Sequence, residues 1–160
     1  MLKLSFEEKK VQVFNNKCVV VTLTGEIENL ANDPFDYPKN FWSWLTKLKC
    51  THPFQNHVVT FQGKAVCSDN DTFDLKTGER IAEARAKIKA YHTMEVICGK
   101  LFRHYTKKTF GNQAKECLDE IWKMQVAGKP LDEGLWGAHA KYIMLYRQEV
   151  EHLAKLLGEA

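Results

Sequence analysis

The chain has 160 residues, with 44% hydrophobic side chains, 27% charged side chains and a formal net charge of +3. This composition excludes a disordered or collagen-like chain. No apolar run approaches the roughly 18 residues that span a bilayer, and the N-terminal residues lack the apolar core of a signal peptide. We therefore expect a soluble cytoplasmic protein with no membrane partner, folded as one domain over residues 1–160.

The cysteines predict structural thiols and no metal site. Cys18, Cys50, Cys67, Cys98 and Cys117 are widely spaced, and no CxxC pair occurs. All except Cys50 have apolar neighbours, where a free thiol behaves as a small hydrophobic side chain. In a cytosolic compartment such thiols are expected to stay reduced.

Two segments near the N-terminus predict an antiparallel hairpin over residues 10–25, because they alternate or are rich in β-branched residues. Asn15 and Asn16 between them tolerate the positive φ of a tight turn. A third strand is predicted over residues 57–67, where Gly63 indicates a bend or a bulge. The three segments together predict a small antiparallel sheet.

Residues 26–56 form an aromatic-rich insertion between the predicted strands, with a short helix expected over residues 41–49. Exposed aromatic side chains are typical of a partner-binding surface. The alternative is a local aromatic core that packs over the sheet. The candidates for a partner surface are Tyr37, Trp42 and Trp44.

The second half of the sequence is helical. Apolar residues recur in steps of three and four and predict a long helix over residues 75–106, with Thr72 or Asp74 as its N-cap. A C-terminal helical hairpin is predicted over residues 109–160, with helices at 113–126 and 132–157. Strands followed by helices predict an α+β fold in which the sheet packs on the long helix.

Positive charge is concentrated on the predicted long helix. Residues 76–108 contain nine basic and three acidic side chains, so this helix is more positive than the whole chain. Phosphates are bound by such charges without regard to sequence. The alternative is a solvated face whose aliphatic stems cover apolar neighbours. The candidates for binding an anionic partner are Arg85, Lys89, Lys100, Arg103, Lys107 and Lys108.

No catalytic signature is present, since the sequence lacks GxGxxG, GxxxxGK, GxSxG and HExxH motifs. Cys50, His52 and His57 are of the types that bind zinc, but their spacing matches no zinc finger. Glu149 and His152 supply only one copy of a pair that di-metal bundles use twice. We therefore assign no catalytic residue and no cofactor, and favour a protein that is not an enzyme.

Residues 63–86 carry a recognisable pattern: a strand ending in Ala-x-Cys, an acidic turn, Phe73-Asp74, and a helix beginning with Gly78, Ile81-Ala82 and Arg85-Ala86. The pattern resembles small uncharacterised proteins of bacteriophages and prophages. The resemblance implies a phage-related origin, a bacterial host cytoplasm and a strand–turn–helix core, and it supplies no activity.

The same pattern has a physical interpretation that does not depend on the resemblance. Asp74 is placed to cap the helix, while Gly78 and Ala82 allow a close approach of helix to strand. Arg85 is placed to reach back to the carboxylates of Asp69 or Asp71.

Three functions fit these features. The first is a non-enzymatic binding protein that contacts a protein partner, for example a phage accessory factor that modulates a host protein. The second is a nucleic-acid-binding protein that uses the basic helix over residues 76–108. The third is a homo-oligomer that sequesters a nucleotide-like anion between aromatic rings and cationic side chains.

Overall fold

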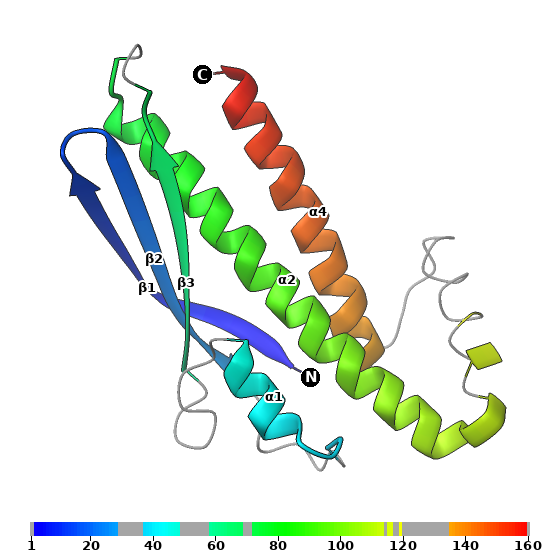
Figure 1. The fold of residues 1–160 in the computed structure, drawn as a ribbon. Coiled ribbons are helices and arrows are strands. Elements are labelled where there is room, and N and C mark those ends of the chain that lie inside the picture. Colours follow the sequence, from blue (N-terminus) through cyan, green and yellow to red (C-terminus); the bar gives the residue numbers. More distant parts are fainter. Residues whose placement is uncertain are drawn as a thin grey trace.

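The computed structural model describes residues 2–28, 37–48, 58–68, 72–113, 115–116, 119 and 135–159. Its three strands form one antiparallel sheet in the order β1-β2-β3, and the long helix α2 packs on that sheet (Figure 1). The predicted α+β fold is therefore confirmed. The elements in chain order are β1 (Lys3–Phe14), β2 (Cys18–Glu28), α1 (Phe41–Lys47), β3 (Val58–Val66), α2 (Leu75–Phe110), the 3-10 turn η1 (Gly111–Gln113) and α4 (Leu135–Glu159).

The hairpin is longer than the predicted range of residues 10–25, because β1 begins at Lys3 and β2 ends at Glu28. A bulge between Phe6 and Glu8 inserts one residue into β1. The insertion shifts the phase of the alternating pattern, so a constant period of two does not extend across it. Residues 26–28, which the sequence assigned to the insertion over residues 26–56, therefore belong to β2.

The hairpin turn forms at the predicted asparagines. Asn15 and Asn16 both have a φ of 53°, and the amide of Lys17 donates to the carbonyl of Phe14 at 3.1 Å. A positive φ at both central residues matches the right-handed twist of the flanking strands. The prediction for this turn is confirmed.

The sequence predicted a bend or a bulge at Gly63, and this prediction is wrong, because β3 pairs with β2 without interruption. The role of Gly63 is to admit the backbone of α2. A Cβ atom on Gly63 would overlap the carbonyl oxygen of Ala82 and lie 2.6 Å from the amide nitrogen of Ala86. A glycine is required wherever two backbones approach this closely. The predicted close approach at Ala82 is therefore confirmed.

Helix α2 begins and ends with defined caps. Asp74 is the predicted N-cap, and its side chain accepts from the amide of Lys76 at 3.0 Å. The helix continues past the predicted end at residue 106, and there Thr106 is buried with its hydroxyl donating to the Phe102 carbonyl at 2.8 Å. Gly111, with a φ of 55°, then ends the helix.

Helix α4 packs along α2 (Figure 1). The buried hydroxyl of Tyr142 accepts from the amide of Leu4 at 2.6 Å, which fixes α4 to the start of β1. The bounds of α4 differ from the predicted helix 132–157 by a few residues. The predicted helix 113–126 falls largely outside the described residues, so only the second helix of the hairpin predicted over residues 109–160 is described.

Helix α1 is anchored at the end of the sheet nearest to the C-terminal half of α2 (Figure 1). Phe41 and Leu45, one turn apart, are fully buried in a core cluster that also contains Met94 and Ile97 of α2. Burying side chains of this size contributes roughly 1.5–3 kcal/mol each. This anchor fixes the aromatic side chains of α1 relative to α2.

Replacing Gly63 by alanine is predicted to lower the free energy of unfolding by about 3 kcal/mol or more, because the new methyl group overlaps the backbone of α2. Gly158→Ala is the matched control, since nothing lies within 4 Å of a Cβ there. Alanine in that helical position should stabilise by up to about 1 kcal/mol. Urea unfolding measures the free energy of unfolding of both variants. Equal values for the two variants would contradict the close approach of α2 to β3 at Gly63.

Candidate functional site

Five of the six basic candidates follow one side of α2. Lys89 follows Arg85 by four residues, and the next cation on this side, Lys100, is eleven residues further on, which is three turns of an α-helix. Arg103 and Lys107 continue the row in steps of three and four. Lys108 lies off this side of the helix. The basic row, in order, is Arg85, Lys89, Lys100, Arg103 and Lys107.

The first two members of the row bind the edge of the sheet. Arg85 donates to the carbonyl of Lys64 at 2.6 Å, and Lys89 donates to the carbonyl of Gln62 at 2.7 Å. Both carbonyls belong to β3, the strand at one edge of the sheet, where no neighbouring strand pairs with them. Arg85 and Lys89 therefore serve the fold, and the carboxylates expected to bind Arg85 lie outside the described residues.

Lys100, the third member of the row, connects the basic helix to the aromatic residues of α1, two regions that the sequence analysis treats separately. The ammonium nitrogen of Lys100 lies 4.5 Å from the centre of the Trp44 ring. A cation over an indole face is attracted by the ring quadrupole, by about 0.5–1 kcal/mol at an exposed site. The pair fixes α1 and α2 side by side at this end of the molecule.

The last two members of the row are exposed to solvent. Arg103 and Lys107 have no ion-pair partner among the described residues. Lys47, one turn after Trp44, adds a further exposed cation from α1. We call Trp44, Lys47, Lys100, Arg103 and Lys107 the basic–aromatic surface.

The two helical segments that carry this surface contain no acidic residue. The sequence contains no aspartate or glutamate between Val96 and Gln113 or within Phe41–Lys47. Net charge in the rest of the chain is correspondingly less positive. A region with one sign of charge attracts a polyanion over a distance of about a Debye length, roughly 8–10 Å near physiological salt.

The aromatic candidates are neither fully enclosed nor fully exposed. Phe41 is buried, and the ring of Tyr37 stacks on it at 5.0 Å. The ring centroids of Trp42 and Tyr37 are 4.9 Å apart, and those of Trp44 and Phe41 are 5.7 Å apart. Tyr37, Trp42 and Trp44 remain half-buried, so each has part of its ring in the core and part at the surface.

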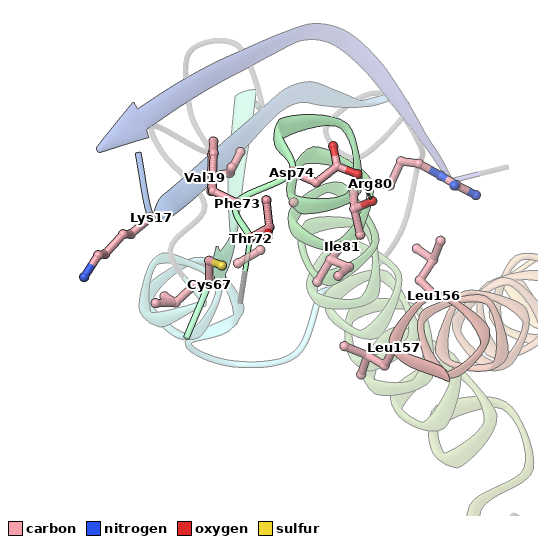
Figure 2. A pocket seen from close by; sticks show the side chains of 14 residues that line it. Lys17, Val19, Cys67, Thr72, Phe73, Asp74, Arg80, Ile81, Leu156 and Leu157 are labelled. Carbon is pink, nitrogen blue, oxygen red and sulfur yellow. Dashed lines mark hydrogen bonds between the residues drawn. The ribbon is translucent and has the colours of Figure 1, made fainter. Parts of the chain in front are cut away.

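A cavity of about 570 Å³ lies at the opposite end of α2 (Figure 2). Val19, Phe73, Ile81 and Leu156 supply apolar walls. The charged ends of Lys17 and Arg80 extend from opposite sides of the cavity, away from each other (Figure 2). The two cations therefore do not converge on one anion in this arrangement.

Three of the five thiols, those of Cys18, Cys67 and Cys98, lie among the described residues. Burial raises the pKa of Cys98 to about 12, so its thiol stays protonated and inert at neutral pH. Cys18 and Cys67 are half-buried, while Cys50 and Cys117 lie outside the described residues. Within the described ranges, no group of three or more His, Cys, Asp or Glu side chains is arranged to hold a metal ion.

Comparison with known proteins adds no family: no family model, curated protein or solved structure matches this chain. In the part of the chain that the structure describes, no helix is both long enough and apolar enough to cross a bilayer.

Sequence reasoning identified both halves of the basic–aromatic surface and missed their contact. Trp44 and Lys100 lie 56 residues apart in the chain, and no local pattern links them. Lys47 was also missed, since a single lysine in a short helix carries no signal of its own. The division of the basic row at Lys89 depends on the position of the β3 edge, which the sequence does not reveal.

His139 predicts a pH dependence of stability at the contact between α4 and α2, where it packs against Gly99. Burial lowers the pKa of His139 from 6.5; the Glu95 carboxylate opposes this shift, and the Arg103 guanidinium adds to it. The unfolded chain then binds the proton more tightly. Stability should therefore be complete above pH 6.5 and fall as the pH is lowered from there.

Urea unfolding of the wild type and of His139→Gln, each at about pH 7.5 and pH 5.5, measures this effect. The wild type should lose more stability over this interval than the variant, whose side chain does not titrate. An equal loss in both proteins would show that another group is responsible.

Proposed function

We propose that this protein binds single-stranded nucleic acid through the basic–aromatic surface. The observation that carries the proposal is the contact between Lys100 and Trp44, with the ammonium nitrogen 4.5 Å from the ring centre. This contact places a cation against an indole ring, beside a stretch of α2 whose sequence contains no aspartate or glutamate. Proteins that bind single strands combine these two elements, a positive surface for the backbone and aromatic rings for the bases.

Phosphates are the expected ligands of the exposed cations. Arg103 and Lys107 lie about 6 Å apart along α2, at a rise of 1.5 Å per residue, which is close to the spacing of successive phosphates in an extended strand. Neither has an ion-pair partner among the described residues. Each cation that neutralises a phosphate releases a bound counterion, so affinity should fall steeply as salt increases.

The half-buried rings favour a single strand over a duplex. A base can stack on a ring only when its own face is free, and a duplex encloses the faces of its bases. The ring of Trp44 is held between α1 and α2 and loses little freedom on binding. A stacked base contributes about 1–3 kcal/mol in such sites.

A protein partner fits this surface less well. The cores of protein–protein interfaces are depleted in lysine, whereas three of the five residues in the basic–aromatic surface are lysines. A sequestered nucleotide-like anion would need converging cations, and those at the cavity point apart (Figure 2). Nucleic acid is therefore the anionic partner that the geometry supports best.

The test is fluorescence anisotropy with a labelled single-stranded oligonucleotide of about 20 nucleotides, longer than the roughly 4–16 nucleotides of a single-strand site. Affinity is measured from about 50 to 200 mM salt. Arg103→Gln/Lys107→Gln should lower the slope of log affinity against log salt by about 1.4, since each phosphate contact contributes about 0.7. Trp44→Leu should weaken binding by about 1–3 kcal/mol.

Lys76→Gln/Lys155→Gln is the matched control, because it removes two exposed lysines elsewhere on α2 and α4 and should leave most of the slope intact. Urea unfolding of each variant separates lost binding from lost folding. The proposal is wrong if the wild type does not bind at about 50 mM salt, or if a duplex of the same sequence binds as tightly.

A further inference from the structure

The two edges of the sheet differ in how they are covered. At the β3 edge, Arg85 and Lys89 occupy two successive outward carbonyls. At the β1 edge, Tyr142 of α4 covers the amide of Leu4, and no described strand pairs with the rest of that edge. Figure 1 shows the C-terminal half of β1 at the outer margin of the molecule. An uncovered edge strand is a template for a further strand.

The hydrogen bond of Leu4 identifies which backbone groups of β1 point outward. Alternate residues in an antiparallel strand direct their amide and carbonyl groups to opposite edges. Leu4 donates to Tyr142 rather than to β2, so it belongs to the outward set. Counted across the bulge at Glu7, the outward set continues as Phe6, Lys9, Val11 and Val13.

This stretch of β1 also exposes apolar side chains. Val11, Val13 and Phe14 are 36%, 41% and 49% exposed. Val11 and Val13 pair with the buried Val21 and Val19 of β2, so they face the same side of the sheet as α2 but extend past it. A solvated edge strand normally carries polar residues at such positions.

We propose that a second copy of this chain pairs with β1, strand against antiparallel strand, to form a continuous six-stranded sheet across a two-fold axis. The proposal is independent of the proposed function, because the basic–aromatic surface lies on α1 and α2. In a two-fold pairing each contact occurs twice. The strand must therefore be complementary to its own reversed sequence.

The sequence of β1 satisfies this condition when the axis passes through Lys9. Glu8 then lies opposite Lys10 of the second copy on the open face of the sheet, and the reciprocal pair repeats the attraction. With Glu7 as the bulged residue, Val11 lies opposite Phe6 of the second copy on the α2 face. Outward backbone groups meet outward groups in this register.

In this register Lys9 lies opposite Lys9 of the second copy, which brings two like charges together at the axis. Two carboxylates of the same chain already neutralise this lysine. Its ammonium group lies 2.8 Å from Glu79 and 3.2 Å from Glu83 of α2. A register moved by one pair would instead place Lys10 against Lys10 of the second copy, with no described carboxylate bound to either. Bulges and charges often protect an edge strand, but here their arrangement is self-complementary.

Sedimentation equilibrium over about 1–100 µM protein tests the proposal. The wild type should show the mass of two chains. Glu8→Lys and Lys10→Glu should each raise the dimer dissociation constant by about tenfold or more, because two attractive pairs become repulsive. The double variant Glu8→Lys/Lys10→Glu restores opposite charges and should recover the wild-type constant to within about threefold.

Lys64→Glu is the matched control, since Lys64 is exposed on the same open face at the other edge of the sheet, and it should leave the dimer unchanged. Both side chains at positions 8 and 10 are exposed, so thermal unfolding of the variants should match the wild type at protein concentrations low enough that all of them are monomeric. A wild type that stays monomeric, single variants that dimerise normally, or a double variant that stays dissociated would each overturn the proposal. Oligonucleotide binding by the double variant is measured separately and should persist.

Discussion

The structure depends on the contact between Gly63 of β3 and the backbone of α2 at Ala82 and Ala86. No side chain separates strand and helix there, because a Cβ atom on Gly63 has no room. This contact sets how far α2 stands from the sheet. It also fixes the rotation of α2 about its axis, and therefore which side chains face the β3 edge and which face solvent.

That rotation divides the basic row into two uses. Arg85 and Lys89 lie level with the β3 edge and complete the hydrogen bonding of Lys64 and Gln62, which also protects that edge from other strands. Beyond the end of the sheet the same side of α2 meets α1, where Lys100 lies over Trp44 and Arg103 and Lys107 face solvent. One continuous row of cations thus covers an edge at one end and forms a binding surface at the other.

Local signals in the sequence predicted local structure well. Asp74 as N-cap, the Asn15-Asn16 turn and the periodicity of α2 each depend on residues close in sequence, and the structure confirms them. The role of Gly63 is not predictable from its neighbours in sequence, because the backbone that it admits belongs to α2, some twenty residues further along the chain. The start of β1 was missed because the bulge at Glu7 shifts the alternating phase. The contact between Trp44 and Lys100 depends on how α1 docks, which no spacing encodes.

The division of the basic row is tested most directly by the double variant Arg85→Gln/Lys89→Gln in two assays, urea unfolding and single-strand binding at about 150 mM salt. We predict a loss of about 1 kcal/mol or more in the free energy of unfolding, since two carbonyls lose charged donors. Affinity should stay within about twofold, because Lys89 lies about 16 Å along the helix from Lys100, beyond the roughly 8 Å Debye length. Unchanged stability with a large loss of affinity would contradict the division of the basic row.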